Sequence, residues 1–172
     1  MATTTRPPRA LSPAQQALGL RTLFPQSSVT VRATGVVWVG AIRPTPLSRT
    51  YTVRVTYTVD DYPTVLVLDP PLEPREGEPL PHTFHGGSLC LHEDHEWTPT
   101  KHLVDTILPW TAEWLAHYEL WKATGQWHGD GAPRATDEIA LTSQVEQHFN
   151  RANRRAAQRA ARRDTPQRTR QG

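Results

Sequence analysis

The sequence predicts an α/β protein of the α+β type, in which an antiparallel meander sheet is flanked by helices. Residues 51–59, YTVRVTYTV, alternate between apolar or aromatic and polar side chains. This period-2 pattern is typical of a strand with one buried face. Short connections join this segment to the strand signals on either side, and short connections favour antiparallel neighbours. Helical patterns before and after the strands complete the α+β prediction.

The first expected element is a helix that begins at Ser12-Pro13 and ends near Phe24. The Ser12 side chain can cap free backbone N–H groups, and Pro13 at the first helical position loses nothing by lacking its own N–H. The helix should stop before Pro25, because the residue before a proline disfavours helical backbone. Leu18 and Phe24 are its expected core contacts.

Strand signals and a long loop follow the first helix. One alternating run spans residues 29–39, the second is 51–59, and the third, 65–68, is apolar on both faces. The proline-rich stretch 69–81 fits no regular element. Residues 81–99 are dense in His, Gly and acidic side chains. Long ordered loops often carry function, so this last segment is the first place to look for a site.

Helical periodicity returns after Pro99. Apolar side chains in residues 103–108 predict a short helix that ends at Pro109, where a second helix opens and runs to a glycine stop at Gly125. The second helix carries an aromatic stripe made of Trp110, Trp114, Tyr118 and Trp121. Aromatic stripes at this spacing are usually core, so we expect the tryptophan rings to be buried behind the loop that contains Cys90.

Charge divides the chain. The formal net charge is +2, but residues 151–172 hold eight arginines and one aspartate, a charge of +7, whereas residues 1–150 hold 11 basic and 16 acidic side chains, a charge of −5. We therefore expect a disordered N-terminus (1–10), one main domain (11–135) and a C-terminal helix with an arginine-rich tail (136–172). The tail is either a solvated helix end and disordered terminus or a contact for an acidic or nucleic-acid partner. A nucleic-acid-binding module ranks last among the possible functions, because no nucleic-acid-binding fold signature accompanies the tail.

Length and composition indicate a globular protein. The 172 residues are 37% hydrophobic and 21% charged, and roughly 150 residues make one domain. The longest apolar run, residues 35–42, is far shorter than the roughly 18 residues that span a bilayer, which excludes a transmembrane protein. No apolar segment of a secretory signal follows the N-terminus, so we expect a cytoplasmic protein with no membrane partner.

Cys90 is the main candidate for chemistry, and as the single cysteine it excludes an internal disulfide. A free thiol has a pKa of about 8.5, and neighbouring imidazolium groups would raise its thiolate fraction. The alternative is a small buried core thiol. Two weaker alternatives are a zinc site, for which the flanking histidine pairs 82/85 and 92/95 match no known ligand spacing, and a Cys/His hydrolase.

The order of these motifs resembles that of the ubiquitin-conjugating enzyme (UBC-like) fold. After the strand signals stand Gly87-Ser88-Leu89-Cys90-Leu91 and then Trp97-Thr98-Pro99, and in that family the cysteine between strands and helix carries a thioester. The tryptophan-rich segment 107–129 is similar to the bacterial ubiquitin-conjugating-like proteins of type II (short) CBASS antiphage operons. Those proteins act beside a cGAS/DncV-like nucleotidyltransferase. The resemblance spans about residues 12–135.

One departure from the family pattern concerns the segment before Cys90. The eukaryotic enzymes usually carry His-Pro-Asn about ten residues before the cysteine, whereas here His82-Thr83-Phe84 stands eight residues before it and no asparagine follows. Thr83, His85 or the backbone N–H groups of the two following glycines would have to replace that asparagine in stabilising an oxyanion or supporting the loop.

What the resemblance implies is an acyl carrier without cofactor or metal. A ubiquitin-activating-like enzyme acting in trans adenylates a protein C-terminus, the thioester passes to Cys90, and Cys90 delivers the acyl group to an amine of a target protein or small molecule. The conjugated protein is expected to be the cyclase, which conjugation primes for antiviral signalling. Glu93 and Asp94 are candidates for orienting or deprotonating the amine, and they are equally explained as solvated loop acids.

Two alternatives share the same fold. A catalytically inert UBC-like binding partner of the cyclase is favoured by the missing asparagine and disfavoured by the retained cysteine. A conjugating enzyme of a separate bacterial ubiquitin-like pathway would keep the chemistry and change the donor protein. A thioester assay separates the enzyme from the inert protein.

Overall fold

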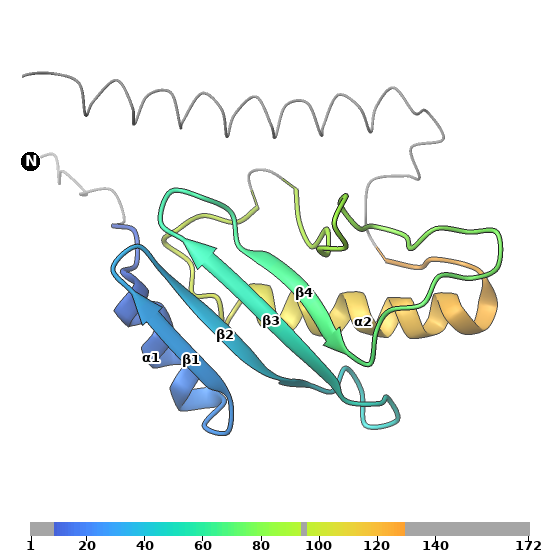
Figure 1. Ribbon diagram of the computed structural model, residues 1–172, viewed down its shortest axis with the longest axis horizontal. Helices are drawn as coiled ribbons and strands as arrows, with labels where there is room; N and C mark the ends of the chain where they lie inside the picture. The colour runs from blue at the N-terminus through green and yellow to red at the C-terminus, as the bar shows by residue number, and fades with distance from the viewer. Residues whose placement is uncertain (1–8, 94–95, 130–172) are drawn as a thin grey trace, which may run out of the picture. The chain divides into compact units, whose positions relative to one another are not determined.

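A computed structural model describes residues 9–93 and 96–129 of the chain, in which one helix precedes four strands and a second helix follows them (Figure 1). The elements in chain order are α1 (Pro13–Leu23), β1 (Ser28–Arg32), β2 (Gly35–Ile42), β3 (Tyr51–Thr58), β4 (Thr64–Asp69) and α2 (Ile107–Thr124). The expected last helix and the arginine-rich tail lie outside the described residues. Within the described part, no helix is both long and apolar enough to cross a membrane.

The four strands form one antiparallel sheet in the order β1-β2-β3-β4. Each strand pairs with the next one along the chain, so Val55 of β3 lies between Trp38 of β2 and Val65 of β4. The predicted α+β class and the antiparallel meander are thus confirmed. Alternation along β3 is also as predicted, because Tyr51 and Val53 are buried while Arg54 is exposed.

The interpretation of residues 29–39 as one continuous strand is wrong. The chain turns at Ala33 and Thr34, and the run forms the β1–β2 hairpin. Gly35 is the first residue of β2 and pairs with Thr58 at the end of β3. A Cβ at Gly35 would lie 2.3 Å from the carbonyl oxygen of Tyr57. Only a glycine fits so close to the neighbouring backbone, so Gly35 marks the break that the alternating pattern hides.

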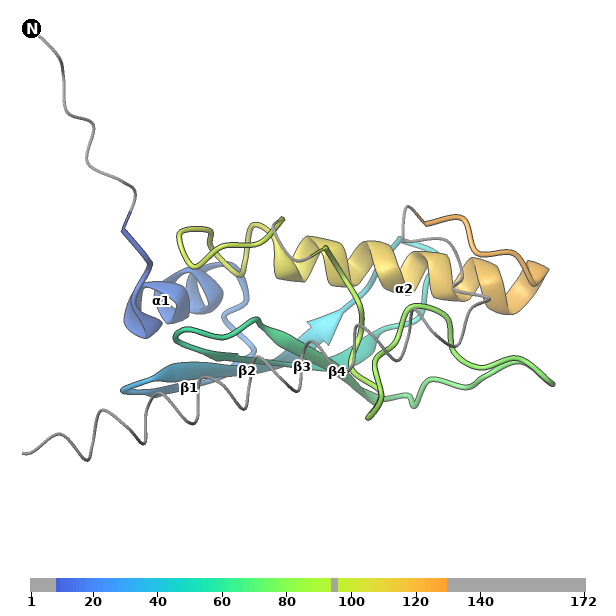
Figure 2. The same ribbon diagram turned by 90° about the horizontal axis from the view of Figure 1, so that it is seen from above.

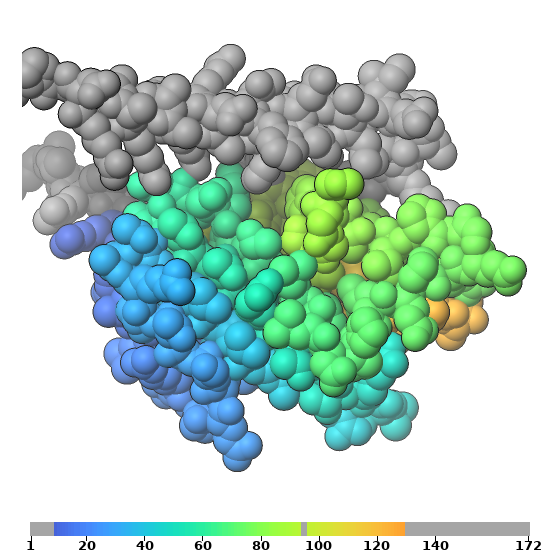
Figure 3. All heavy atoms as spheres, in the orientation of Figure 1, coloured from blue at the N-terminus to red at the C-terminus, as the bar shows by residue number. Residues whose placement is uncertain are grey.

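Both helices cover the same face of the sheet (Figure 2). The opposite face is formed by the strands themselves and, beside them, by the segment that follows β4 (Figure 3). On the covered face, α1 directs Ala17 and Leu20 inward, while Leu18 is 67% exposed, so the expected core role of Leu18 is wrong. The half-buried Phe24 does pack on the core, in an edge-to-face contact with Trp38 in which the two ring centres are 5.4 Å apart.

A buried amide joins α1 to the segment that precedes α2. The predicted Ser12 cap is confirmed, because its side chain accepts from the N–H of Gln15. One residue further on, the buried Gln16 amide donates from Nε2 to the carbonyl of Lys101 at 2.9 Å, and its Oε1 accepts from the N–H of Leu103 at 2.8 Å. Gln16 therefore supplies both partners that this buried stretch of backbone needs.

The prediction of two helices meeting at Pro109 is wrong, because α2 begins at Ile107 and continues through the proline. Pro109 is the third residue of α2, in the first turn, where backbone N–H groups have no partner within the helix. Its missing donor therefore costs nothing. The predicted glycine stop is confirmed: Gly125 is left-handed, with a φ of 81°, and its N–H donates to the carbonyl of Trp121.

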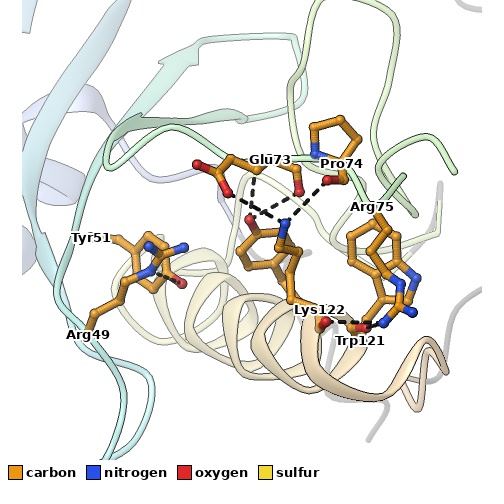
Figure 4. A network of polar contacts seen from close by, with 8 residues as sticks. Arg49, Tyr51, Glu73, Pro74, Arg75, Trp121 and Lys122 are labelled. Atoms are coloured by element: carbon orange, nitrogen blue, oxygen red, sulfur yellow. Dashed lines mark hydrogen bonds and ion pairs between the residues drawn. The ribbon is translucent and has the colours of Figure 1, made fainter. Parts of the chain in front are cut away.

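The proline-rich stretch after β4 has no regular structure, as predicted, but polar contacts attach it to α2 (Figure 4). The Tyr118 hydroxyl accepts from the backbone N–H of Glu73 at 2.9 Å and also lies 3.3 Å from the carbonyl oxygen of Glu73. Lys122 donates from Nζ to the carbonyl of Pro74 and pairs with the Glu73 carboxylate at 3.5 Å. These bonds fix the path of the chain from the sheet toward residue 82.

Arg75 binds the C-terminal end of α2. One guanidinium nitrogen lies 3.1 Å from each of the carbonyl oxygens of Trp121 and Lys122. These carbonyls belong to the last turn, where the helix dipole favours a cation. The carbonyl of Trp121 also accepts from the N–H of Gly125, and Arg75 binds that carbonyl and the carbonyl of Lys122 together. Arg75 thus acts as a cap supplied from a distant part of the chain.

Tyr51 ties β3 to α2 through its hydroxyl. The hydroxyl donates to the Glu119 carboxylate at 3.0 Å and accepts from Nε of Arg49 at 2.9 Å. Burial raises the pKa of Tyr51 to about 12; the Arg49 hydrogen bond opposes this shift and the Glu119 carboxylate reinforces it. The hydroxyl therefore keeps its proton, and the donated bond to Glu119, well above pH 10.

Candidate active site around Cys90

Cys90 ends a short hairpin that lies beside β4. The two arms of the hairpin exchange backbone bonds from the N–H of Phe84 to Ser88 and from the N–H of Cys90 to His82, at 2.8 and 2.9 Å. The second arm is joined to the sheet, because the N–H of Leu89 donates to the carbonyl of Val65. Leu89 is buried, and Cys90 beside it is half-buried. The thiol is thus carried on backbone that is fixed from both sides.

Two glycines make the turn at the tip of this hairpin. Gly86 and Gly87 have φ values of 97° and 81°, in the left-handed region that disfavours other residues. A Cβ on either glycine would meet no heavy atom within 4 Å. Backbone conformation, and not crowding, therefore requires glycine here, and the turn leaves the surface near Cys90 without side chains at two positions.

His82, at the start of the hairpin, is held in a strained conformation. Its φ of 47° is uncommon for a residue with a side chain. Its carbonyl accepts from the N–H of Cys90 at 2.9 Å and from Nε1 of Trp114 at 3.1 Å, and its ring stacks on Trp127 with centres 4.9 Å apart. Strain of this kind persists only where surrounding contacts fix it, and it is frequent at functional sites.

The tryptophan stripe supports the hairpin as expected, although not uniformly. Trp114 and Trp121 are 4% and 0% exposed, which confirms their predicted burial. Trp114 reaches the hairpin directly through its bond to the carbonyl of His82. Trp110 is only half-buried. Its ring contacts the ring of His92, which follows Cys90 in the sequence, and the two ring centres are 5.5 Å apart.

The predicted supporting residues occupy different positions around the thiol. Thr83 lies opposite Leu89 across the hairpin, so by strand alternation it shares a face with Leu89 and not with Cys90. Its hydroxyl donates to the carbonyl of Leu80 at 3.2 Å. His85 is exposed at the tip of the hairpin, and Glu93 is exposed after it. Asp94 lies outside the described residues.

The sequence does not predict that His82 supports the Cys90 hairpin. The sequence points to His82 only as a possible metal ligand and as the start of an incomplete His-Pro-Asn motif. Its partner Trp114 lies 32 residues away, and no local pattern predicts either that bond or a positive φ at a histidine. The one sequence signal for this arrangement is Trp127, which lies at the end of the tryptophan-rich segment 107–129. Its ring packs on both His82 and Trp114.

A metal centre has no ligand set in the described part of the chain. Within residues 9–93 and 96–129, no three His, Cys, Asp or Glu side chains gather closely enough to hold a metal ion. The two histidine pairs that suggested zinc are separated instead: His82 stacks on Trp127, whereas His92 lies against Tyr62 and Trp110. His95 is outside the described residues.

Comparison with known proteins assigns the chain to a family. The family model of the type II CBASS E2 protein matches residues 16–135, more than half of the chain. The matched segment contains the whole sheet, the Cys90 hairpin and α2. Among curated proteins, none matches the chain. The α+β architecture is compatible with this match, and the chain belongs to the family of type II CBASS E2 proteins, the E2-like proteins of CBASS antiphage operons.

Proposed function

We propose that the protein is a ubiquitin-conjugating-type acyltransferase in which Cys90 carries an activated protein C-terminus as a thioester. One observation carries the proposal: the only cysteine of the chain lies within the family-matched segment, half-buried, on a hairpin anchored to β4 and α2. A carrier needs a sulfur that a partner can reach and a backbone that does not move when the acyl group arrives. The half-buried position of Cys90 and the backbone bonds of its hairpin support the proposal on both counts.

The proposed chemistry has two acyl-transfer steps. In the first, the Cys90 thiolate attacks the carbonyl carbon of the donor C-terminus, which an activating enzyme holds as its own thioester. The new C–S bond forms, the old one breaks, and the activating enzyme's thiolate leaves. In the second, an amine nitrogen attacks the same carbon, the C–S bond to Cys90 breaks, and the amine gives up a proton as the amide forms. The thiolate of Cys90 is then free for another cycle.

Stabilisation of the oxyanion in each step requires hydrogen-bond donors near the sulfur. Two of the donors considered from the sequence are already engaged, since the Thr83 hydroxyl donates to Leu80 and the N–H of Gly87 donates to Phe84. Either would have to exchange its partner to serve the oxyanion. The exposed His85 and the N–H of Gly86 complete the set of candidates.

The proposed partners follow from the operon type. The conjugated protein is the cGAS/DncV-like nucleotidyltransferase, which is primed through its own C-terminus, and a ubiquitin-activating-like enzyme supplies the donor in trans. Glu93 and Asp94 remain the candidates that orient or deprotonate the acceptor amine. The acceptor is a lysine of a target protein or a small amine.

A charging assay tests this proposal. With an activating enzyme, ATP and the cyclase, the chain should gain the mass of the cyclase minus one water, in a form that excess thiol cleaves. Cys90→Ala should abolish the adduct. Cys90→Ser should give an oxyester that resists thiol, because an alkoxide is a poorer leaving group than a thiolate.

Two other results would redirect the assignment. If the activating enzyme consumes ATP and no thiol-sensitive adduct forms, while the chain still binds the cyclase, the inert binding partner becomes the correct account. If the adduct forms with a ubiquitin-like protein and not with the cyclase, the chain serves a separate conjugation pathway. The affinity of Cys90→Ala for the cyclase, which measures binding without thioester formation, is the reference for both results.

A further inference from the structure

We propose that His92 is a positioning residue for the transfer step, and that it holds Glu93, three residues after Cys90, in one orientation. This inference rests on the proposed function, because it assigns a part in the delivery of the acyl group to an amine. It concerns a residue that the acyl-carrier chemistry above leaves without a role. The contacts of the imidazole carry the argument.

The His92 ring lies between two aromatic rings from different parts of the fold. Its centre is 5.7 Å from that of Tyr62, in the connection between β3 and β4, and 5.5 Å from that of Trp110, in the first turn of α2. Tilted aromatic contacts at these separations are favourable and directional. The ring is therefore held by the sheet side and the helix side of the domain together.

The same ring is bonded to the following residue. Nδ1 of His92 lies 2.8 Å from the carbonyl oxygen of Glu93. A carbonyl oxygen can only accept, so Nδ1 must carry the hydrogen and donate it. This fixes the backbone of Glu93 to a side chain that cannot itself rotate freely.

A second acid completes the arrangement. The Glu96 carboxylate accepts from the backbone N–H of Glu93 at 2.8 Å, and the N–H of Glu96 donates to the carbonyl of Glu93 at 3.1 Å. Lys101 donates from Nζ to the carbonyl of Glu96. The Glu93 backbone is thus fixed at both its N–H and its C=O, and the Glu96 carboxylate is used in doing so.

The two acids therefore have different parts. Glu96, which sequence reasoning did not single out, is a structural acceptor. Glu93 has an exposed side chain on fixed backbone three residues after the thiol. An acid that must meet an incoming amine gains from such fixing, since a small misplacement of a reacting group lowers the rate strongly.

Two substitutions separate the hydrogen bond from the ring. His92→Phe keeps an aromatic ring between Tyr62 and Trp110 and removes the donor. His92→Asn places an amide N–H close to the position of Nδ1 and removes the ring. We expect His92→Phe to slow discharge of the loaded thioester to an amine by about tenfold, which is roughly the effect of one hydrogen bond, and to leave Cys90 charging within about twofold of wild type. His92→Asn should recover part of the discharge rate, because it restores the donor without the ring contacts to Tyr62 and Trp110.

Two measurements distinguish positioning from a general loss of structure. Hydrogen exchange of the Glu93 amide should be faster in His92→Phe than in wild type, and intermediate between the two in His92→Asn. In a double-mutant cycle, His92→Phe should add little to Glu93→Gln, because a residue that acts through Glu93 has no effect once that carboxylate is gone. The matched control is His128→Phe, since His128 is an exposed histidine outside the site.

The failures are separable. A wild-type chain that never accepts the donor overturns the proposed function itself. A wild-type chain that charges and discharges, with His92→Phe discharging at the same rate, overturns the inference about His92 alone. Equal losses of charging and discharge in His92→Phe, or additive effects in the double-mutant cycle, also overturn it.

Discussion

The indole N–H of Trp114 and the backbone N–H of Cys90 donate to the same oxygen, the carbonyl of His82, at 3.1 and 2.9 Å. Through this one atom α2 reaches the backbone of the candidate nucleophile. The carbonyl can accept both bonds because it has two lone pairs. Removing one donor leaves the other bond in place, so the two contributions can be measured separately.

Trp114→Phe should loosen the Cys90 hairpin while the domain stays folded. The change removes the donor and part of the ring, and we expect a loss of about 1–2 kcal/mol in the free energy of unfolding, against about 3–5 kcal/mol for Trp114→Ala. Alkylation of the Cys90 thiol should become faster in Trp114→Phe. The matched control is Trp121→Phe, because the buried Trp121 indole nitrogen has no hydrogen-bond partner among the described residues. Equal alkylation rates in both variants would contradict the prediction.

Alkaline pH should destabilise the protein through Tyr51. Its pKa is raised to about 12 in the folded chain, whereas an unfolded tyrosine ionises near pH 10. The folded state therefore holds the proton more tightly, and the stability this contributes is complete below about pH 10 and is lost as the pH rises toward 12.

Unfolding measured in denaturant between about pH 8 and pH 12 checks this prediction. Tyr51→Phe should fall less steeply with pH than wild type, each variant being compared with its own value at pH 8. Some slope should remain, because burial, assisted by the charge of Asp60, also raises the pKa of Tyr57. Identical slopes for wild type and Tyr51→Phe would show that the Tyr51 proton is not linked to folding.

Gln16→Ala should be among the most damaging changes on α1. It leaves the carbonyl of Lys101 and the N–H of Leu103 without their partner, and each unsatisfied buried group costs roughly 1–3 kcal/mol. We expect a loss of roughly 2–5 kcal/mol, measured by urea unfolding. Gln26→Ala, at an exposed position, is the control and should change stability by less than about 0.5 kcal/mol. A loss below about 1 kcal/mol in Gln16→Ala would show that this stretch of backbone finds other partners.

Arg75→Met should fray the end of α2. The substitution keeps most of the apolar stem and removes the guanidinium that binds the carbonyls of Trp121 and Lys122. We expect a loss of about 1–3 kcal/mol in stability, with faster hydrogen exchange confined to the last turn of the helix. Arg54→Met, which removes an exposed arginine from β3, should have little effect. Unchanged exchange at the helix end would contradict the capping role of Arg75.

The elements that depend on local pattern were predictable from the sequence, and those set by distant partners were not. The alternation of β3, the Ser12 cap and the Gly125 stop each follow from side chains within a few residues of one another. The β1–β2 turn escaped prediction because Ala33 and Thr34 carry no turn signal, and the requirement for Gly35 comes from Tyr57 on another strand.

The candidate site divides in the same way. Cys90 stands out in the sequence as the single thiol beside two glycines. The positive φ of His82, its bond to Trp114 and the position of His92 between Tyr62 and Trp110 depend on segments far apart along the chain. Thr83 and His85 are predicted as replacements for the asparagine that the family motif would place before Cys90, and position in the sequence says nothing about which face of a hairpin a side chain occupies.

The anchoring of the Cys90 hairpin has a mechanical consequence. Its first arm is bonded to α2 through the carbonyl of His82, and its second arm is bonded to β4 through the N–H of Leu89. A partner tethered to the sulfur, as proposed above, would pull on the residue that directly follows Leu89 and whose own N–H is bonded to the carbonyl of His82. Tension would therefore be divided between helix and sheet, and the backbone that leads to the thiol would resist displacement while a large acyl partner moves at the end of its tether.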